Sequence, residues 1–191
     1  MAAQVETVKT IKAERLTRAA FAPFGEVIST LEAEPAERTG FYNDDSGLFM
    51  LGVLDCDHPV EFLVRRSMIR DFRVRYLERH QEITQTFIPL AGHPFLVVVA
   101  RADAAEEQGI PAFEEIHAFF VGGDTAVNLH RGTWHEPPYP LVDNCVTIVT
   151  SHCALTEGLM SKLNERNEIE GYDVEKRNVT ERTGVHLRIE L

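Results

Sequence analysis

The sequence is short of cysteine and tryptophan and carries a large excess of acid. Its 191 residues include 3 Cys and 1 Trp, and 30 Asp plus Glu against 19 Lys plus Arg give a net charge of −11. Cys56, Cys145 and Cys153 are an odd set without Cys-x-x-Cys spacing, which favours free thiols in a reducing cytoplasm over a disulfide framework. Cys145 lies in an apolar run and is interpreted as core filling.

Long apolar runs and basic clusters are also missing. No stretch approaches the length of a membrane span, and residues 1–9 contain no apolar run of the kind found in a signal peptide. A net charge of −11 with a pI near 5.2 would repel nucleic acid and anionic membranes. We therefore expect a cytoplasmic protein with no nucleic-acid or membrane partner.

Short segments with the alternating apolar pattern of β-strands fill most of the chain, whereas helical signals are few. Thr17 is expected to cap a short helix that ends at Phe21, and four apolar residues at helical spacing predict a second helix over 155–167. Many short strands at regular spacing indicate an all-β sandwich or barrel. Strands are predicted at 5–11 (an edge strand), 49–54, 60–66, 72–80, 84–90, 95–100, 117–121, around Trp134, at 146–150 and at 185–191, the last pairing in its own sheet or with a neighbouring subunit.

Two stretches contain polar residues where a strand should be apolar. Residues 72–76 alternate apolar residues with arginines, and the same alternation places Glu78 and His80 on the inward face and Arg79 in water. An acid and an imidazole facing a core indicate a metal site, since both bind divalent first-row ions. The second stretch, 128–138, contains two histidines, an arginine and Trp134, which alternates away from His135 and is interpreted as core packing.

These two stretches resemble the metal motifs of the cupin superfamily. Glu78, His80 and Gln85 occupy the positions of the first motif, His-x-His-x4-Glu, and residues 131–135 resemble the turn and histidine of the second. More narrowly, segments across about 14–150 resemble the signature blocks of the ureidoglycolate lyase family; they are residues 22–28, 77–80, 84–90, 94–99 and 128–135.

The resemblance implies an all-β fold, a cupin-type double-stranded β-helix (jelly-roll) barrel with a few short helices. It implies a single cupin domain over 1–191, with a core at about 14–150 and a helix plus C-terminal strand extension at 151–191, and a homodimer by family analogy. The implied activity is a lyase reaction that splits ureidoglycolate into glyoxylate and urea, a step of ureide (allantoin) and purine catabolism.

The resemblance also implies a ligand set for a divalent metal, Mn, Fe, Ni or Zn. The set is Glu78, His80, Gln85 and His135, and glutamine where many cupins carry glutamate removes one negative charge from it. The alternative is a metal-free polar cluster in which Glu78 accepts a hydrogen bond from His80 and Gln85 bridges.

The remaining candidate residues are those that would bind or convert a small hydroxy acid. Arg131 could clamp the substrate carboxylate, or pair with an acid such as Asp124 or Glu136. His130 could act as general acid or base, or bond to a backbone carbonyl. Asn128 is a further candidate for substrate binding, although an asparagine beside a turn is more often structural.

One segment departs from the family pattern. In residues 40–47, Tyr42 and Asn43 stand where the family carries His and Ile, and Tyr42 is a candidate for contact with the substrate. The sequence therefore also permits a metal-dependent cupin enzyme that acts on another small hydroxy or keto acid, or a non-catalytic cupin that binds a small acid.

Overall fold

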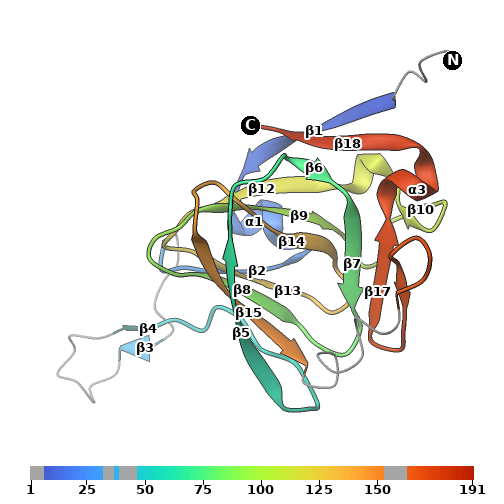
Figure 1. Ribbon diagram of the computed structural model, residues 1–191. Helices are drawn as coiled ribbons and strands as arrows, with labels where there is room; N and C mark the ends of the chain where they lie inside the picture. Colours follow the sequence, from blue (N-terminus) through green and yellow to red (C-terminus); the bar gives the residue numbers. More distant parts are fainter. Residues whose placement is uncertain (1–6, 32–36, 39–46, 153–162) are drawn as a thin grey trace, which may run out of the picture.

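A computed structural model describes residues 7–31, 37–38, 47–152 and 163–191 of the chain. They form two main β-sheets (Figure 1). The larger sheet contains, in spatial order, β16 (Ile169–Glu170), β17 (Val174–Asn178), β7 (Tyr76–His80), β14 (Trp134–Pro140), β9 (Phe95–Ala100), β12 (His117–Val121), β1 (Thr7–Arg15), β18 (Val185–Glu190) and β6 (Arg73–Val74). The smaller contains β2 (Gly25–Ile28), β13 (Ala126–Leu129), β8 (Gln85–Pro89), β15 (Cys145–His152) and β5 (Val60–Ser67).

Short elements complete the structure. Two-stranded ribbons join β3 (Glu37–Arg38) to β4 (Gly47–Leu48) and β10 (Glu106–Glu107) to β11 (Ile110–Pro111). The helical elements are α1 (Arg18–Phe21), the 3-10 turn η2 (Phe113–Glu115) and α3 (Val179–Thr183). Thr17 caps α1 as predicted, because its hydroxyl accepts a hydrogen bond from the Ala20 amide. No helix of the described residues is long and apolar enough to cross a membrane.

The core is divided into two layers by the larger sheet. Every residue of β9 is buried, and its side chains alternate between the layers, as expected for a strand covered on both faces. Val97 and Val99 join the layer that also includes Phe87 and Leu129 of the smaller sheet, so this layer lies between the sheets. Leu96 and Val98 join the other layer, with Trp134 and Leu187. The larger sheet curls around this second layer (Figure 1), and the result is the all-β, cupin-type barrel expected from the sequence.

Three predicted strands differ from the structure. The N-terminal strand β1 is not at an edge, since it pairs in parallel with β12 on one side and β18 on the other. Residues 49–54 are not a strand, and the Val53 carbonyl accepts a hydrogen bond from the Asn128 side chain instead of from the backbone of a neighbouring strand. The strand predicted at 72–80 is interrupted at Arg75, whose amide donates to the Glu136 carboxylate.

The C-terminal segment closes the larger sheet. β18 pairs within its own chain, in parallel with β1 and antiparallel with β6, which answers the question left open by the sequence. The helix predicted over 155–167 falls partly on residues 153–162, outside the described part. Residues 163–167 contain a turn, in which the Asn167 amide donates to the Asn164 carbonyl.

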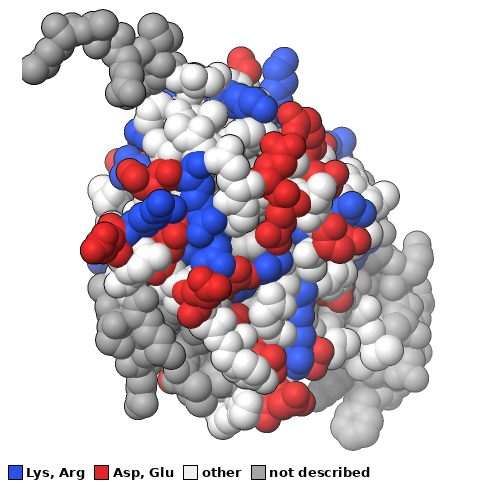
Figure 2. Space-filling view, turned by 90° about the vertical axis from the view of Figure 1, so that its right-hand side faces the viewer, with Lys and Arg blue, Asp and Glu red and all other residues white. Residues whose placement is uncertain are grey.

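Ion pairs hold the C-terminal elements against the rest of the barrel. Arg79 pairs with Glu175 of β17 and with Glu106, and its guanidinium stacks on the Trp134 ring, so the prediction that it points into water was wrong. Arg182 of α3 pairs with Glu168 at 2.6 Å. On this side of the molecule acidic and basic side chains are interspersed (Figure 2).

Candidate functional site

Adjacent strands of the larger sheet bring together three of the predicted metal ligands. β7 and β14 run antiparallel with Glu78 opposite His135, and His80 lies two residues further along β7. One ligand atom from each of these three side chains lies within 4.8 Å of the others. The interruption at Arg75 makes this possible, because the chain turns Leu77 toward the layer of Trp134 and leaves Glu78 and His80 on the opposite face.

The His135 ring has one nitrogen in a hydrogen bond and one without a partner. Nδ1 lies 2.9 Å from the Thr133 carbonyl, which fixes it as the protonated nitrogen. Nε2 therefore carries the lone pair; it is buried without a hydrogen bond and lies 3.7 Å from Glu78 Oε1. Backbone carbonyls orient metal-binding histidines in this way.

His80 and Gln85 face each other across the same space. Gln85 Nε2 lies 3.1 Å from His80 Nε2, and both side chains are buried. The other ring nitrogen of His80, Nδ1, is buried without a partner. The His80 and His135 rings are stacked with centroids 5.4 Å apart. The Gln85–His80 contact is the one that the metal-free alternative requires, whereas the described residues include no hydrogen bond between Glu78 and His80.

The surroundings favour neutral imidazoles at both positions. Burial, with the neighbouring His135, lowers the pKa of His80 to about 4, although the Glu78 carboxylate opposes the shift. Burial likewise lowers the pKa of His135 despite Glu78 and the bond to Thr133. A neutral imidazole is the form that binds a metal. The unpartnered lone pair of His135 Nε2, with ligand atoms of Glu78 and His80 within 4.8 Å, therefore fits a divalent cation.

Glu78, His80 and Gln85 line a cavity of about 410 Å³ between the two sheets, and the His135 ring is buried behind them. Its wall includes Pro137 and Pro138, where β14 shifts its register against β9, as expected for prolines that cannot donate to a ladder. Glu78 is the single carboxylate among the lining residues. They are Leu63, Val64, Arg65, Glu78, His80, Gln85, Phe87, Pro137, Pro138, Val149, Ser151 and Val174.

Arg65 and Ser151 are cavity residues that the sequence reasoning did not identify. The signal for Arg65 was present in the alternation of residues 60–66, which places Arg65 on the same face as Leu63. None of the segments that resemble the family contains Arg65, so the resemblance did not draw attention to it.

The other predicted site residues do not line this cavity. The amide group of Asn128 bonds to Thr86, Glu26 and the Val53 carbonyl. His130 Nε2 lies 3.4 Å from Glu26 Oε1. Arg131 pairs with Asp55 at 2.9 Å, so it has an acidic partner, but a different one from those considered. Glu136 instead pairs with Arg70 at 3.0 Å, and Tyr42 lies outside the described residues.

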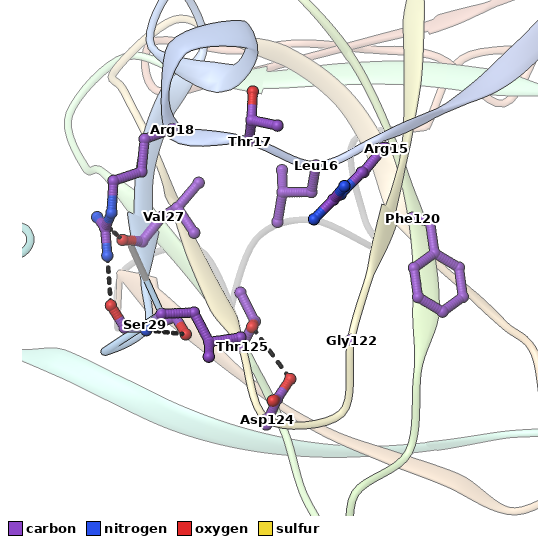
Figure 3. Close-up of a pocket in the computed structure, with 11 residues that line it drawn as sticks. Arg15, Leu16, Thr17, Arg18, Val27, Ser29, Phe120, Gly122, Asp124 and Thr125 are labelled. Atoms are coloured by element: carbon purple, nitrogen blue, oxygen red, sulfur yellow. Dashed lines mark hydrogen bonds between the residues drawn. The ribbon is translucent and has the colours of Figure 1, made fainter. Parts of the chain in front are cut away.

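A second cavity, of about 200 Å³, lies where the end of β1 and the start of α1 meet the β12–β13 turn (Figure 3). Arg15 points into it, but Arg18 is bonded to the carbonyls of Val27 and Ser29, and Asp124 accepts a hydrogen bond from Thr125. Neither histidine nor cysteine is among its lining residues, so it lacks the groups found in the first cavity.

An all-β barrel with an internal cluster of histidines and a carboxylate is a protein of the cupin superfamily. More narrowly, this chain belongs to the ureidoglycolate lyase family, whose family model, described as "Ureidoglycolate lyase", matches residues 8–182. The match extends past residue 150, where the sequence comparison had placed its end.

Curated relatives support the same assignment. The chain is 35% identical to the ureidoglycolate lyase of Pseudomonas paraeruginosa over 139 residues, which are 68% of this chain and 76% of the relative. It is 34% identical to that of Azotobacter vinelandii over 146 residues, 72% and 81% of the two chains. Among solved structures, RmlC from Streptococcus suis in complex with dTDP-D-xylose aligns with 51% of this chain and 48% of that chain, at 10% identity and a TM-score of 0.31, values too low to carry an argument.

Proposed function

We propose that this protein is a ureidoglycolate lyase, which cleaves ureidoglycolate to glyoxylate and urea in ureide catabolism. The reaction is that of a carbon–nitrogen lyase of the amidine-lyase type. Family membership supports the substrate, and the observation that carries the location of the site is the cluster of Glu78, His80 and His135, of which Glu78 and His80 line the cavity.

The substrate is a carbinolamide, with hydroxyl and urea nitrogen on one carbon beside a carboxylate. Cleavage needs a base for the hydroxyl proton and an acid for the departing urea nitrogen. The pKa values of His80 and His135 are lowered by burial, which favours the neutral imidazole that can bind a metal. Phe87 and Val149 give the cavity an apolar part of its wall.

We propose that Glu78, His80, Gln85 and His135 hold a divalent cation, Mn, Fe, Ni or Zn. When bound, such a cation lowers the pKa of a substrate hydroxyl and orients the substrate. The unpartnered nitrogens of His80 and His135 support this proposal.

The test is glyoxylate release from racemic ureidoglycolate by the purified protein, before and after chelation. We expect rapid release from half of the substrate, lost on chelation and restored by added metal. Release that survives chelation would support the lyase activity and reject the role of the cation. If the metal-loaded protein releases no glyoxylate, the lyase activity is rejected. The ligand would then be another small hydroxy or keto acid, which the protein either converts or only binds.

We further propose that residues 1–191 form one domain, with its core at about 14–150. We propose that the protein is a cytoplasmic homodimer. Its ligand is a small hydroxy acid, and it has no nucleic-acid or membrane partner. Pairing of β17 and β18 into the larger sheet supports one domain. The net charge of −11 disfavours nucleic acid. Exposed apolar side chains on the edge strand β5, Phe62 and Val64, support self-association.

A further inference from the structure

Arg65 differs from the other arginines near the cavity because no acid neutralises it. Arg70 pairs with Glu136 at 3.0 Å, and Arg79 pairs with Glu106 at 3.2 Å. The hydrogen bond of Arg65 runs from Nε to Ser67 Oγ at 3.0 Å, and none of the described carboxylates forms an ion pair with it. Its guanidinium is thus a half-buried cation without an anionic partner.

The strand that carries Arg65 aims it at the candidate reaction site. β5 pairs with β15 so that Arg65 lies opposite Thr147, and Leu63 and Arg65 share one face of the strand. Both line the cavity together with Glu78, His80 and Gln85. The next residue, Arg66, is exposed, and the alternation of the strand places it on the opposite face.

The electrostatics of the cavity also favour an added anion. Burial and the nearby Arg70 lower the pKa of Arg65, while Glu78 and Glu136 oppose the shift. Arginine nevertheless stays charged at any pH at which the protein is folded. A bound carboxylate would replace the hydration that burial has removed from this guanidinium.

From this geometry we infer that Arg65 binds the carboxylate of the substrate. The planar guanidinium matches a carboxylate with two parallel hydrogen bonds. This inference rests on the proposed function for the identity of the acid, since the unpaired guanidinium by itself selects only for a carboxylate. It moves the role predicted for Arg131 to a residue that lines the cavity. Arg65 positions the carboxylate at one side of the cavity, so that the adjoining carbon faces Glu78 and His80.

A pair of small probes tests the inference without turnover. Glycolate and glycolamide differ in the carboxylate, and their dissociation constants can be measured by ligand-observed NMR. We expect the wild-type protein to prefer glycolate by about 10- to 100-fold, the range for a charge-assisted pair. Arg65→Met should reduce the preference to about threefold or less, and Arg65→Lys should retain part of it.

The matched control is Arg66→Met, which removes the same charge from the other face of β5 and should leave the preference unchanged. Equal binding of the two probes to the wild-type protein, or a preference that survives in Arg65→Met, would overturn the inference. If Arg65→Met does not fold, Arg65→Lys provides the test. An unchanged preference for glycolate in Arg65→Lys would show that the guanidinium group is not what recognises the carboxylate.

Turnover measured on the same samples separates this inference from the proposed function. Suppose that Arg65→Met loses the preference for glycolate and that the wild-type protein does not cleave ureidoglycolate. This result would support Arg65 as the anion site and reject the lyase activity. Where the wild type cleaves ureidoglycolate, Arg65→Met should raise KM by at least about tenfold with a smaller change in kcat. An unchanged KM would overturn the role of Arg65 and leave the lyase intact.

Discussion

Two buried histidines leave a ring nitrogen unpartnered in the middle of the protein. An unmade hydrogen bond at a buried polar atom costs about 1–3 kcal/mol, and here it occurs twice within one cluster. Such a cost is commonly found at functional sites, where a ligand supplies the missing partner. The Thr133 carbonyl directs His135 Nε2 to the interior, so the lone pair is held ready for a cation.

We therefore predict that His80→Ala and His135→Ala each lose metal and activity together. Removing one of few ligands should lower metal affinity by at least about 100-fold, and turnover of ureidoglycolate should fall in parallel. Metal content after dialysis, measured by mass spectrometry, and glyoxylate release provide the two measurements.

The control for this pair is His117→Ala, because His117 lies on β12 outside the cavity and bonds to Glu14. It should retain metal and activity. An active His80→Ala protein free of metal would show that the cluster is polar packing and that the cation plays no part.

The cluster of Glu78, His80 and His135 could be predicted from the sequence, but the unpaired arginine in the cavity wall, Arg65, could not. Glu78 and His80 were conspicuous because a period-two pattern placed them with apolar residues. The family resemblance favours Arg131 as the residue that binds the substrate carboxylate, yet Arg131 pairs with Asp55 and is not among the residues that line the cavity. Which arginine remains unpaired depends on contacts between distant segments, as in the pairing of Arg70 with Glu136, and no local pattern encodes these.

At the scale of the element, the last strand is a structural part of the barrel. β18 lies between β1 and β6, and its Leu187 is completely buried in the layer that contains Trp134. We predict that Leu187→Ala lowers the free energy of unfolding by about 2–5 kcal/mol through the lost contacts and the cavity that remains. Urea denaturation measures the change.

Leu191→Ala serves as the matched control, since Leu191 is 74% exposed and its truncation should change stability by less than about 0.5 kcal/mol. Equal effects of the two substitutions would mean that β18 does not contribute to the core in solution.

A second element is held by a charge pair whose strength depends on pH. Burial tends to raise the pKa of Glu168, but hydrogen bonds from Arg182 and the Asn178 amide outweigh burial and lower it to about 2. A carboxyl whose pKa is lower in the folded than in the unfolded protein stabilises the fold. This contribution is fully present at pH values above the unfolded pKa, near 4.5, and is lost as the pH falls toward 2.

Glu168→Gln should therefore lower stability by about 2–3 kcal/mol at pH 7, and its difference from the wild type should shrink below about pH 4.5. Denaturation curves from pH 7 to pH 3 measure this difference. Glu170→Gln is the control, because Glu170 is 84% exposed and should show a small difference at all pH values. A Glu168→Gln effect independent of pH would contradict the ion-pair explanation.

Strands formed by continuous apolar runs were the elements best predicted from the sequence. β9 and β12 have the predicted bounds because apolar runs flanked by turns specify them locally. The interruption at Arg75 could not be predicted, because the carboxylate that draws its amide out of the ladder belongs to Glu136, 61 residues away. For the same reason the local pattern of β1 predicts only an edge strand, since its neighbours β12 and β18 follow more than a hundred residues later.

At the scale of the whole molecule, charge and apolar surface are distributed unequally. The chain carries a net charge of −11, so two copies repel each other except where acid is sparse. β5 ends the five-stranded sheet, and its Phe62 and Val64 are each 68% exposed. A free edge strand with an apolar face can pair with its own copy about a two-fold axis.

We predict that the protein is a dimer held through β5 and that Phe62→Glu converts it to a monomer. The substitution places a like charge in each half of a symmetric contact, where burial in an apolar surface makes it costly. Sedimentation velocity at several protein concentrations measures the change.

Phe120→Glu is the matched control, because it places the same charge at another exposed phenylalanine, on β12 away from the edge strand. A dimer that persists in Phe62→Glu would place the interface on another surface, and a monomeric wild-type protein would reject the dimer itself. Because Leu63 and Arg65 of the same strand line the cavity, a monomeric Phe62→Glu protein should also bind glycolate less tightly than the dimer.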